Sequence, residues 1–281
     1  MLRAQAGAYH PPMAPPPLRP PVRRFQPGRA ALRWWLTWWD IVHLGALIAA
    51  LAVTPASYGR QRWPRLARHL VQAAWPVLPW FGVVTALLSL VIARIVIVTA
   101  TSYGLDQYAL GMVVRVLVLE LIPLAAALFV AVRITVPDAG SLAAMRTRGG
   151  FEALRAAGGD PLRDEIAPRA LAGLLSVLLL AALASVITLV LAYLLVHGFS
   201  PWGFERFTRQ VGQVFSPAVT LIFGLKTLAF GAAVSVVPLG SALHDRDLGP
   251  GSPLPLELQG LVRLLMAVLV IEVASLVGNY Y

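Results

Sequence analysis

The sequence predicts an all-α integral membrane protein, with an N-terminal interfacial helix, five transmembrane helices and one short cytoplasmic helix between two spans. Of its 281 residues, 58% are hydrophobic and 13% are charged, whereas about a quarter are charged in soluble domains. The mean hydropathy is +0.73. Several nearly uncharged stretches are long enough to cross a hydrocarbon core about 30 Å thick. These observations exclude a soluble globular domain.

The net charge of +10 is explained by membrane topology. Arginines gather before residue 70 and between Arg146 and Arg169, at the ends of apolar segments, as the positive-inside rule expects. We therefore expect contacts with anionic membrane lipids and no nucleic-acid partner. The absence of cysteine excludes a disulfide framework, a thiolate nucleophile and a Cys-ligated metal.

Residues 1–28 are rich in proline and arginine, which predicts a disordered cytoplasmic tail. No apolar core of a secretory signal follows the first residues, so the tail is not interpreted as a signal peptide. Residues 29–281 are expected to form one membrane domain.

The first apolar helix covers residues 30–53, and its first turns hold four tryptophans, which prefer the headgroup zone. If this helix crossed the membrane, the basic residues before it and those at 60–68 would lie on opposite sides. Two basic flanks cannot both be cytoplasmic after one crossing. We therefore favour an interfacial or re-entrant helix, with a true span as the alternative.

Five stronger apolar segments follow, and each is long enough to span the membrane. They cover about residues 70–100, 108–136, 165–196, 214–240 and 256–278. With the N-terminus and residues 57–69 in the cytoplasm, alternation places the long 137–164 connection in the cytoplasm and the C-terminus in the periplasm. We see no inverted repeat of the kind found in many secondary transporters.

The longest connection predicts a short cytoplasmic helix over about residues 141–159. A glycine pair at 149–150 weakens it, and a second pair at 158–159 supplies a C-terminal stop. Asp160 then suits an N-cap and Pro161 the first helical position, so a new helix should begin there. An ordinary connecting loop is the alternative.

Motifs in this connection resemble the permease family of MCE-associated ABC transporters, the MlaE/YrbE family. Members carry Met-Arg, Ala-Leu, Gly, Asp-Pro and Pro-Arg here, and the residues in register are Met145, Arg146, Ala153, Leu154, Gly158, Asp160, Pro161, Pro168 and Arg169. Other family elements look like those at 119–123, 131–133, 226–230 and Glu272, so the similarity covers about residues 30–281.

The sequence departs from the family pattern in three places. Ser141 stands where the family usually has Glu, glycines at 149–150 replace Glu-Gln, and Leu119 replaces Arg. These departures suit a divergent paralogue or one half of a heteromeric permease.

The resemblance implies the permease subunit of an ABC transporter in the bacterial inner membrane. It would move phospholipid or a similar hydrophobic lipid between that membrane and a periplasmic MCE protein, a role linked to outer-membrane lipid asymmetry. The implied partners are a second permease protomer, identical or different, a cytoplasmic ABC ATPase and an MCE-domain hexamer. A small STAS-type accessory subunit is left open.

The resemblance also assigns the 141–159 helix as the coupling helix, gripped by the ATPase. Its coupling residues would be Arg146, Phe151, Ala153, Leu154, Gly158, Asp160 and Pro161. The chain contains no GxxxxGK[ST] motif, so we expect no ATP hydrolysis and no cofactor of its own, with ATP and Mg²⁺ held by the partner ATPase.

Ionisable residues inside the predicted spans indicate a polar cluster. Besides Arg133 near a span end, they are Arg94, Arg115, Glu120, Lys226, Arg263 and Glu272. Each costs on the order of 2.5–3.5 kcal/mol near a helix centre, so each should face protein, a cavity or another charge. We expect Glu120, Lys226 and Glu272 to meet beside an apolar cavity, with Arg94 and Arg115 nearby.

In the family, these positions border the lipid pocket at the dimer interface. A salt bridge that merely braces the helices is the alternative. Two other functions also stay open, namely an ion- or proton-coupled secondary transporter that uses these charges, and a non-transporting scaffold. No HExxH or GxSxG motif is present, and the charged run 244–247 reads as a solvated turn, so neither an enzyme nor a metal site is expected.

Overall fold

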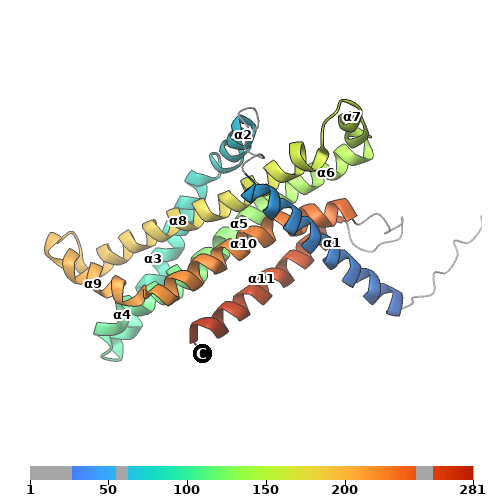
Figure 1. The fold of residues 1–281 in the computed structure, drawn as a ribbon. Coiled ribbons are helices and arrows are strands. Elements are labelled where there is room, and N and C mark those ends of the chain that lie inside the picture. Colours follow the sequence, from blue (N-terminus) through green and yellow to red (C-terminus); the bar gives the residue numbers. More distant parts are fainter. Residues whose placement is uncertain (1–26, 55–62, 245–255, 281) are drawn as a thin grey trace, which may run out of the picture.

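The computed structural model describes residues 27–54, 63–244 and 256–280, and all regular elements in these ranges are helices (Figure 1). Six helical segments of this described part are long and apolar enough to cross a membrane. The predicted all-α integral membrane class is therefore confirmed. The predicted tail lies outside the described residues up to residue 26.

Most of the elements are α-helices, and three short π-helical segments interrupt them. In chain order, the α-helices are α1 (Pro27–Val53), α2 (Trp63–Ala74), α3 (Leu78–Ser102), α4 (Asp106–Val113), α5 (Ile122–Val130), α6 (Val136–Thr147), α7 (Gly150–Ala156), α8 (Ala167–His197), α9 (Phe204–Val214), α10 (Pro217–His244) and α11 (Leu256–Tyr280). The π-helical segments are Val114–Leu121, Ala131–Thr135 and Leu162–Ile166, and a 3₁₀ turn covers Pro201–Gly203.

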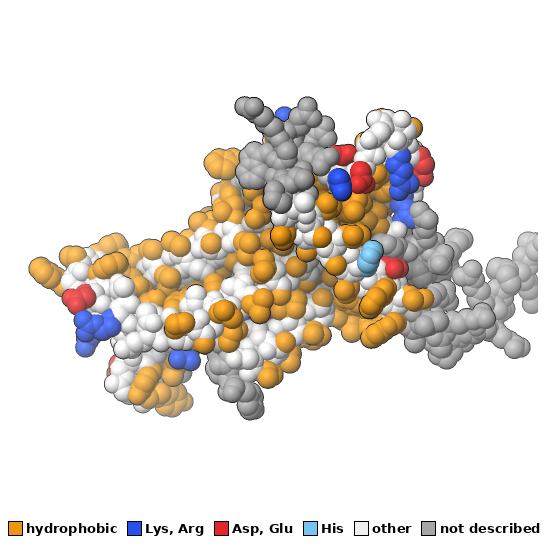
Figure 2. All heavy atoms as spheres, viewed as in Figure 1, with side chains coloured by type: hydrophobic (Ala, Val, Ile, Leu, Met, Phe, Trp, Pro, Cys, Tyr) orange, Lys and Arg blue, Asp and Glu red, His pale blue; other side chains and the backbone are white. Residues whose placement is uncertain are grey.

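The long helices form a bundle in which α8 and α10 lie centrally. α8 packs on α3, α5 and α10, and α10 also packs on α6 and α11. The α3–α4 turn and α9 lie at one end of the bundle, and α7 lies at the other, as the predicted alternation of connections requires (Figure 1). Figure 2 shows hydrophobic side chains along the length of one face, with the charged side chains gathered largely near its two ends.

α1 runs across the bundle near the end that carries α7, rather than alongside the spans (Figure 1). It buries Ile41, Leu44 and Ile48, while Trp35 and Trp39 stay exposed. Its apolar stretch Trp34–Val53 is long enough to cross a membrane. The interfacial position of α1 stays a prediction, which its transverse course favours.

The first predicted span begins later than expected. α2 ends at Ala74, and a turn at Trp75–Val77 separates it from α3, which begins at Leu78 rather than near residue 70. Pro76 explains the break, because proline lacks the N–H of a helix interior and disfavours helical geometry in the residue before it.

The second predicted span extends further than expected. A continuous helical stretch runs from Asp106 to Thr147, so no new helix opens at Ser141. Both of its prolines, Pro123 and Pro137, stand in the first turn of an α-helix that follows a π-helical segment. A π turn shifts the hydrogen-bond register ahead of each proline, so the helix continues past both residues.

The cytoplasmic helix predicted over 141–159 is consequently two pieces. α6 ends at Thr147, Gly149 takes a φ of +74°, and the separate helix α7 covers only Gly150–Ala156. Gly158, with a φ of +80°, terminates the segment as predicted. The predicted coupling helix therefore corresponds to the end of α6 together with α7.

Close packing of α8 on α10 depends on Gly231. A Cβ added at Gly231 would lie 3.2 Å from the carbonyl oxygen of Leu174, whereas no atom lies within 4 Å of the equivalent position at Gly224 on the same helix. We expect Gly231→Val to destabilise the protein by about 1–3 kcal/mol, because overpacking must displace α8 backbone. Thermal unfolding in detergent measures this loss. Gly224→Val, which makes the same change in helix propensity, should leave the melting temperature nearly unchanged, and an equal shift in both variants would contradict the packing argument.

Candidate functional site

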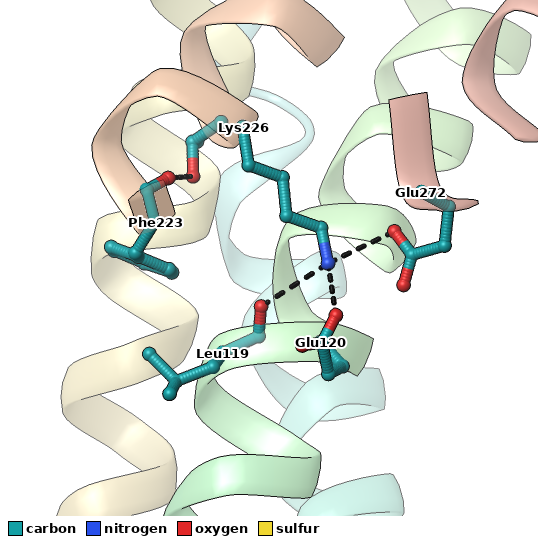
Figure 3. Close-up of polar contacts among 6 residues, drawn as sticks. Leu119, Glu120, Phe223, Lys226 and Glu272 are labelled. Atoms are coloured by element: carbon teal, nitrogen blue, oxygen red, sulfur yellow. Dashed lines mark hydrogen bonds and ion pairs between the residues drawn. The ribbon is translucent and has the colours of Figure 1, made fainter. Parts of the chain in front are cut away.

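A buried lysine joins three of the long helices. The side chain of Lys226, from the middle of α10, is 2% exposed. Its Nζ donates a hydrogen bond to Oε2 of Glu120 and lies 3.0 Å from Oε2 of Glu272 (Figure 3). The backbone carbonyl oxygen of Leu119 lies 3.4 Å from the same Nζ. We call Glu120, Lys226 and Glu272 the Lys226 cluster.

The second span supplies two of the lysine's partners through its π-helical segment Val114–Leu121. Pro123 has no N–H to bond the carbonyl of Leu119, four residues earlier, so this oxygen is available to an outside donor. Lys226 supplies that donor. The kink-prone sequence Leu-Glu-Leu-Ile-Pro therefore presents a carboxylate and a carbonyl side by side toward α10.

Three oxygens surround the ammonium group of Lys226, which has three N–H donors. The oxygens of Glu120 and Leu119 accept hydrogen bonds from it, whereas Oε2 of Glu272 lies within ion-pair distance but has no hydrogen-bond partner within the described part of the chain. The ring of Phe230 adds a fourth neighbour, with its centroid 5.7 Å from Nζ. One ammonium faces two carboxyl groups, so the cluster contains one more acid than base, and Glu120 and Glu272 keep 14% and 16% exposure.

Arg94 and Arg115 do not join this cluster, which corrects the prediction for both residues. Both are exposed on the surface of the single chain, although their neighbours Ala93 and Val114 are buried. A charged side chain on the outside of a span must meet water, headgroups or another subunit.

The apolar cavity expected beside the cluster is not found on the α3 side of the second span. There, Leu117, Leu121 and Ile122 line a space of only about 10 Å³. This volume has room for one water molecule at most, so it cannot hold an acyl chain.

Helix α7 has one face anchored in the protein and one open face. Phe151 is buried in a hydrophobic group that includes Leu44 of α1, Leu142 of α6 and Leu239 of α10. Ala153 on the same helix is exposed, and Leu154 is half-buried. Of the predicted coupling residues, Phe151 and Pro161 are buried in the single chain, so any part that they take in coupling would be through the packing of α7 rather than through contact with a partner.

The remaining predicted coupling residues lie around α7. Gly158 and Asp160 are exposed, and Arg146 is half-buried and donates a hydrogen bond to the carbonyl oxygen of Leu243 near the end of α10. Asp160 acts as the predicted cap, because its Oδ1 accepts a hydrogen bond from the Leu162 N–H at 3.0 Å. The N–H of Asp160 in turn donates to Oδ2 of Asp164 at 3.0 Å.

Sequence reasoning did not predict the polar link between α6 and α8. Arg169 donates to the hydroxyl of Ser141 at 2.6 Å and pairs with Glu165 at 2.9 Å. Ser141 is the position at which we noted a departure from the usual Glu. The Pro-Arg motif that contains Arg169 is the sequence feature from which this contact could have been predicted. The serine hydroxyl thus links α6 to α8 through Arg169.

No group of three or more His, Cys, Asp and Glu side chains suited to a metal ion is found among the residues that the structure describes. A protein-family model described as Permease MlaE matches residues 66–277, which include the Lys226 cluster and α7. Comparison with curated proteins gives no match.

Proposed function

The chain belongs to the MlaE permease family, and on this premise we propose that it is the membrane subunit of an MCE-type ABC transporter that moves phospholipid or a similar hydrophobic lipid. The observation that carries the proposal is the family match over residues 66–277, which takes in α3 to α10 whole and nearly all of α11. The cargo would pass between the bacterial inner membrane and a periplasmic MCE protein.

The proposed mechanism follows the connections of α7. The exposed face around Ala153 is offered to a cytoplasmic ATPase, which binds ATP and Mg²⁺. α6 carries movement of α7 directly into the second span, where Glu120 lies, because the helix is continuous from Asp106 to Thr147. Arg146 carries the same movement to Leu243 on α10, the helix of Lys226. Movement of α7 would therefore reach both the second span, which carries Glu120, and α10, which carries Lys226.

The proposed assembly contains two permease protomers, identical or different. Arg94 and Arg115, exposed on the outside of spans, give a physical reason for a second subunit, because charged side chains in a membrane need a polar partner. An MCE-domain hexamer would exchange lipid with the permease on the periplasmic side, where we expect the C-terminus to lie, and a STAS-type subunit would join the ATPase side in some assemblies.

Purification of the assembly in mild detergent, followed by mass spectrometry of its proteins and lipids, tests this proposal. We expect a nucleotide-binding subunit, an MCE-domain protein and bound phospholipid to purify with the chain. An assembly without any nucleotide-binding subunit would overturn the ABC-transporter function.

The second carboxyl group of the Lys226 cluster favours one second candidate, an ion- or proton-coupled transporter. This candidate requires no ATPase. The purified chain, reconstituted alone into liposomes, would then carry protons or cations down an imposed gradient, whereas the lipid permease should show no such flux.

A further inference from the structure

A cavity of about 390 Å³ lies at the α7 end of the bundle, between α1, α7 and the helix that begins at Pro161. Its apolar wall includes Leu44, Phe151 and Ile166, and its charged residues are Arg146, Arg155 and Asp160. The volume falls within the range of about 300–1,000 Å³ that is usual for small-molecule sites. It is a different space from the Lys226 cluster, which lies within the spans.

The charges around this cavity favour an anion. Arg155 is exposed in the last turn of α7, and the single hydrogen bond from Arg146 to Leu243 leaves its guanidinium with further N–H donors. The carboxylate of Asp160 already has two partners, because it accepts a hydrogen bond from the Leu162 N–H and lies 3.5 Å from Nε of Arg163. Two guanidinium groups therefore stand over an apolar floor without an equal negative charge.

The position of α1 sets the depth of the cavity. One wall belongs to Leu44 of α1, and the same helix exposes Trp34, Trp35 and Trp39 within the preceding turns. Tryptophan side chains concentrate where headgroups meet acyl chains. A basic pocket with an apolar floor at that depth matches an anionic phospholipid, whose phosphate fits the arginines and whose acyl chains fit the floor.

We propose that this cavity holds an anionic phospholipid as a resident ligand that is not transported. Its phosphate would bridge Arg155 on α7 and Arg146 on α6, and its chains would lie against Leu44 and Phe151. The bound lipid would thereby tie α7 to α1. The inference goes beyond the proposed function, because it concerns a lipid that stays in place, and it is tested on the permease without any partner.

The test compares the chain with Arg155→Gln, using native mass spectrometry in a neutral detergent with short-chain phosphatidylglycerol or phosphatidylcholine. We expect preferential binding of phosphatidylglycerol to the unaltered chain and about fivefold weaker binding to Arg155→Gln. This loss corresponds to about 1 kcal/mol for one arginine near an anionic lipid. Arg155→Lys should restore part of the binding.

Arg148→Gln is the matched control, because Arg148 is an exposed arginine of the same connection that does not line the cavity. Equal weakening in Arg148→Gln, or unchanged binding in Arg155→Gln, would overturn the proposal. Displacement of phosphatidylglycerol by millimolar inorganic phosphate would assign the site to a free anion and would overturn the lipid as occupant. None of these outcomes bears on lipid transport, which the purification experiment tests separately.

Discussion

Lys226→Met is expected to abolish lipid transport and to lower the melting temperature of the permease. The substitution keeps the side chain as far as Cε but leaves Glu120 and Glu272 facing each other without the ammonium that lies between them. Breaking a buried ion pair costs about 3–5 kcal/mol. We expect the lower part of this range, because both carboxylates keep some exposure. Thermal unfolding in detergent and transfer of labelled phospholipid in the reconstituted assembly measure the two effects.

A triple variant separates a role in transport from a structural brace. Lys226→Met combined with Glu120→Gln and Glu272→Gln removes the charges together, so no uncompensated carboxylate remains and the melting temperature should recover. If the cluster acts on the cargo, transport stays lost in this stable variant. Recovery of transport together with stability would show that the cluster only holds α10 and α11 to the second span.

The Lys226 cluster could be predicted because its signals are strong. Charges inside apolar spans are costly, so they must meet one another, and Pro123 marks the carbonyl of Leu119 as available. The outward position of Arg94 could not be predicted in this way. α3 is apolar on all sides, so its pattern gives the depth of Arg94 in the membrane but not the face on which it lies.

The number and order of the long helices were also predictable, whereas several boundaries were not. The second span was expected to end at about residue 136, directly before Pro137, yet the helix continues through a π-helical segment to Thr147. A proline that ends a helix and a proline that follows a π turn have the same local sequence pattern. The burial of Phe151 could have been predicted from the sequence, because Phe151 is the one aromatic residue of the 137–164 connection.

Ala153→Arg is expected to release the ATPase without unfolding the permease. Ala153 is exposed on α7, and exposed substitutions usually change stability by about 0.5 kcal/mol or less. In a docked interface, however, a long charged side chain has no space and overpacks the contact. Copurification of the ATPase and lipid transport should both be lost, while the melting temperature of the permease alone stays the same. Thr208→Arg, an equally exposed change on α9 at the other end of the bundle, should affect neither.

Phe151→Ala should separate binding of the ATPase from transmission of its movement. The buried ring anchors α7 to Leu44, Leu142 and Leu239, and truncating a buried Phe costs about 3–5 kcal/mol where the core cannot collapse. The open face of α7 is unchanged, so the ATPase should still copurify, but its ATP hydrolysis should no longer drive lipid transfer. Loss of ATPase binding to the same extent as in Ala153→Arg would contradict this division of α7 into a docking face and an anchor. Helix α7 can transmit movement only when the ATPase holds its open face and the spans hold its buried face. Ala153→Arg removes the first contact, and Phe151→Ala removes the second.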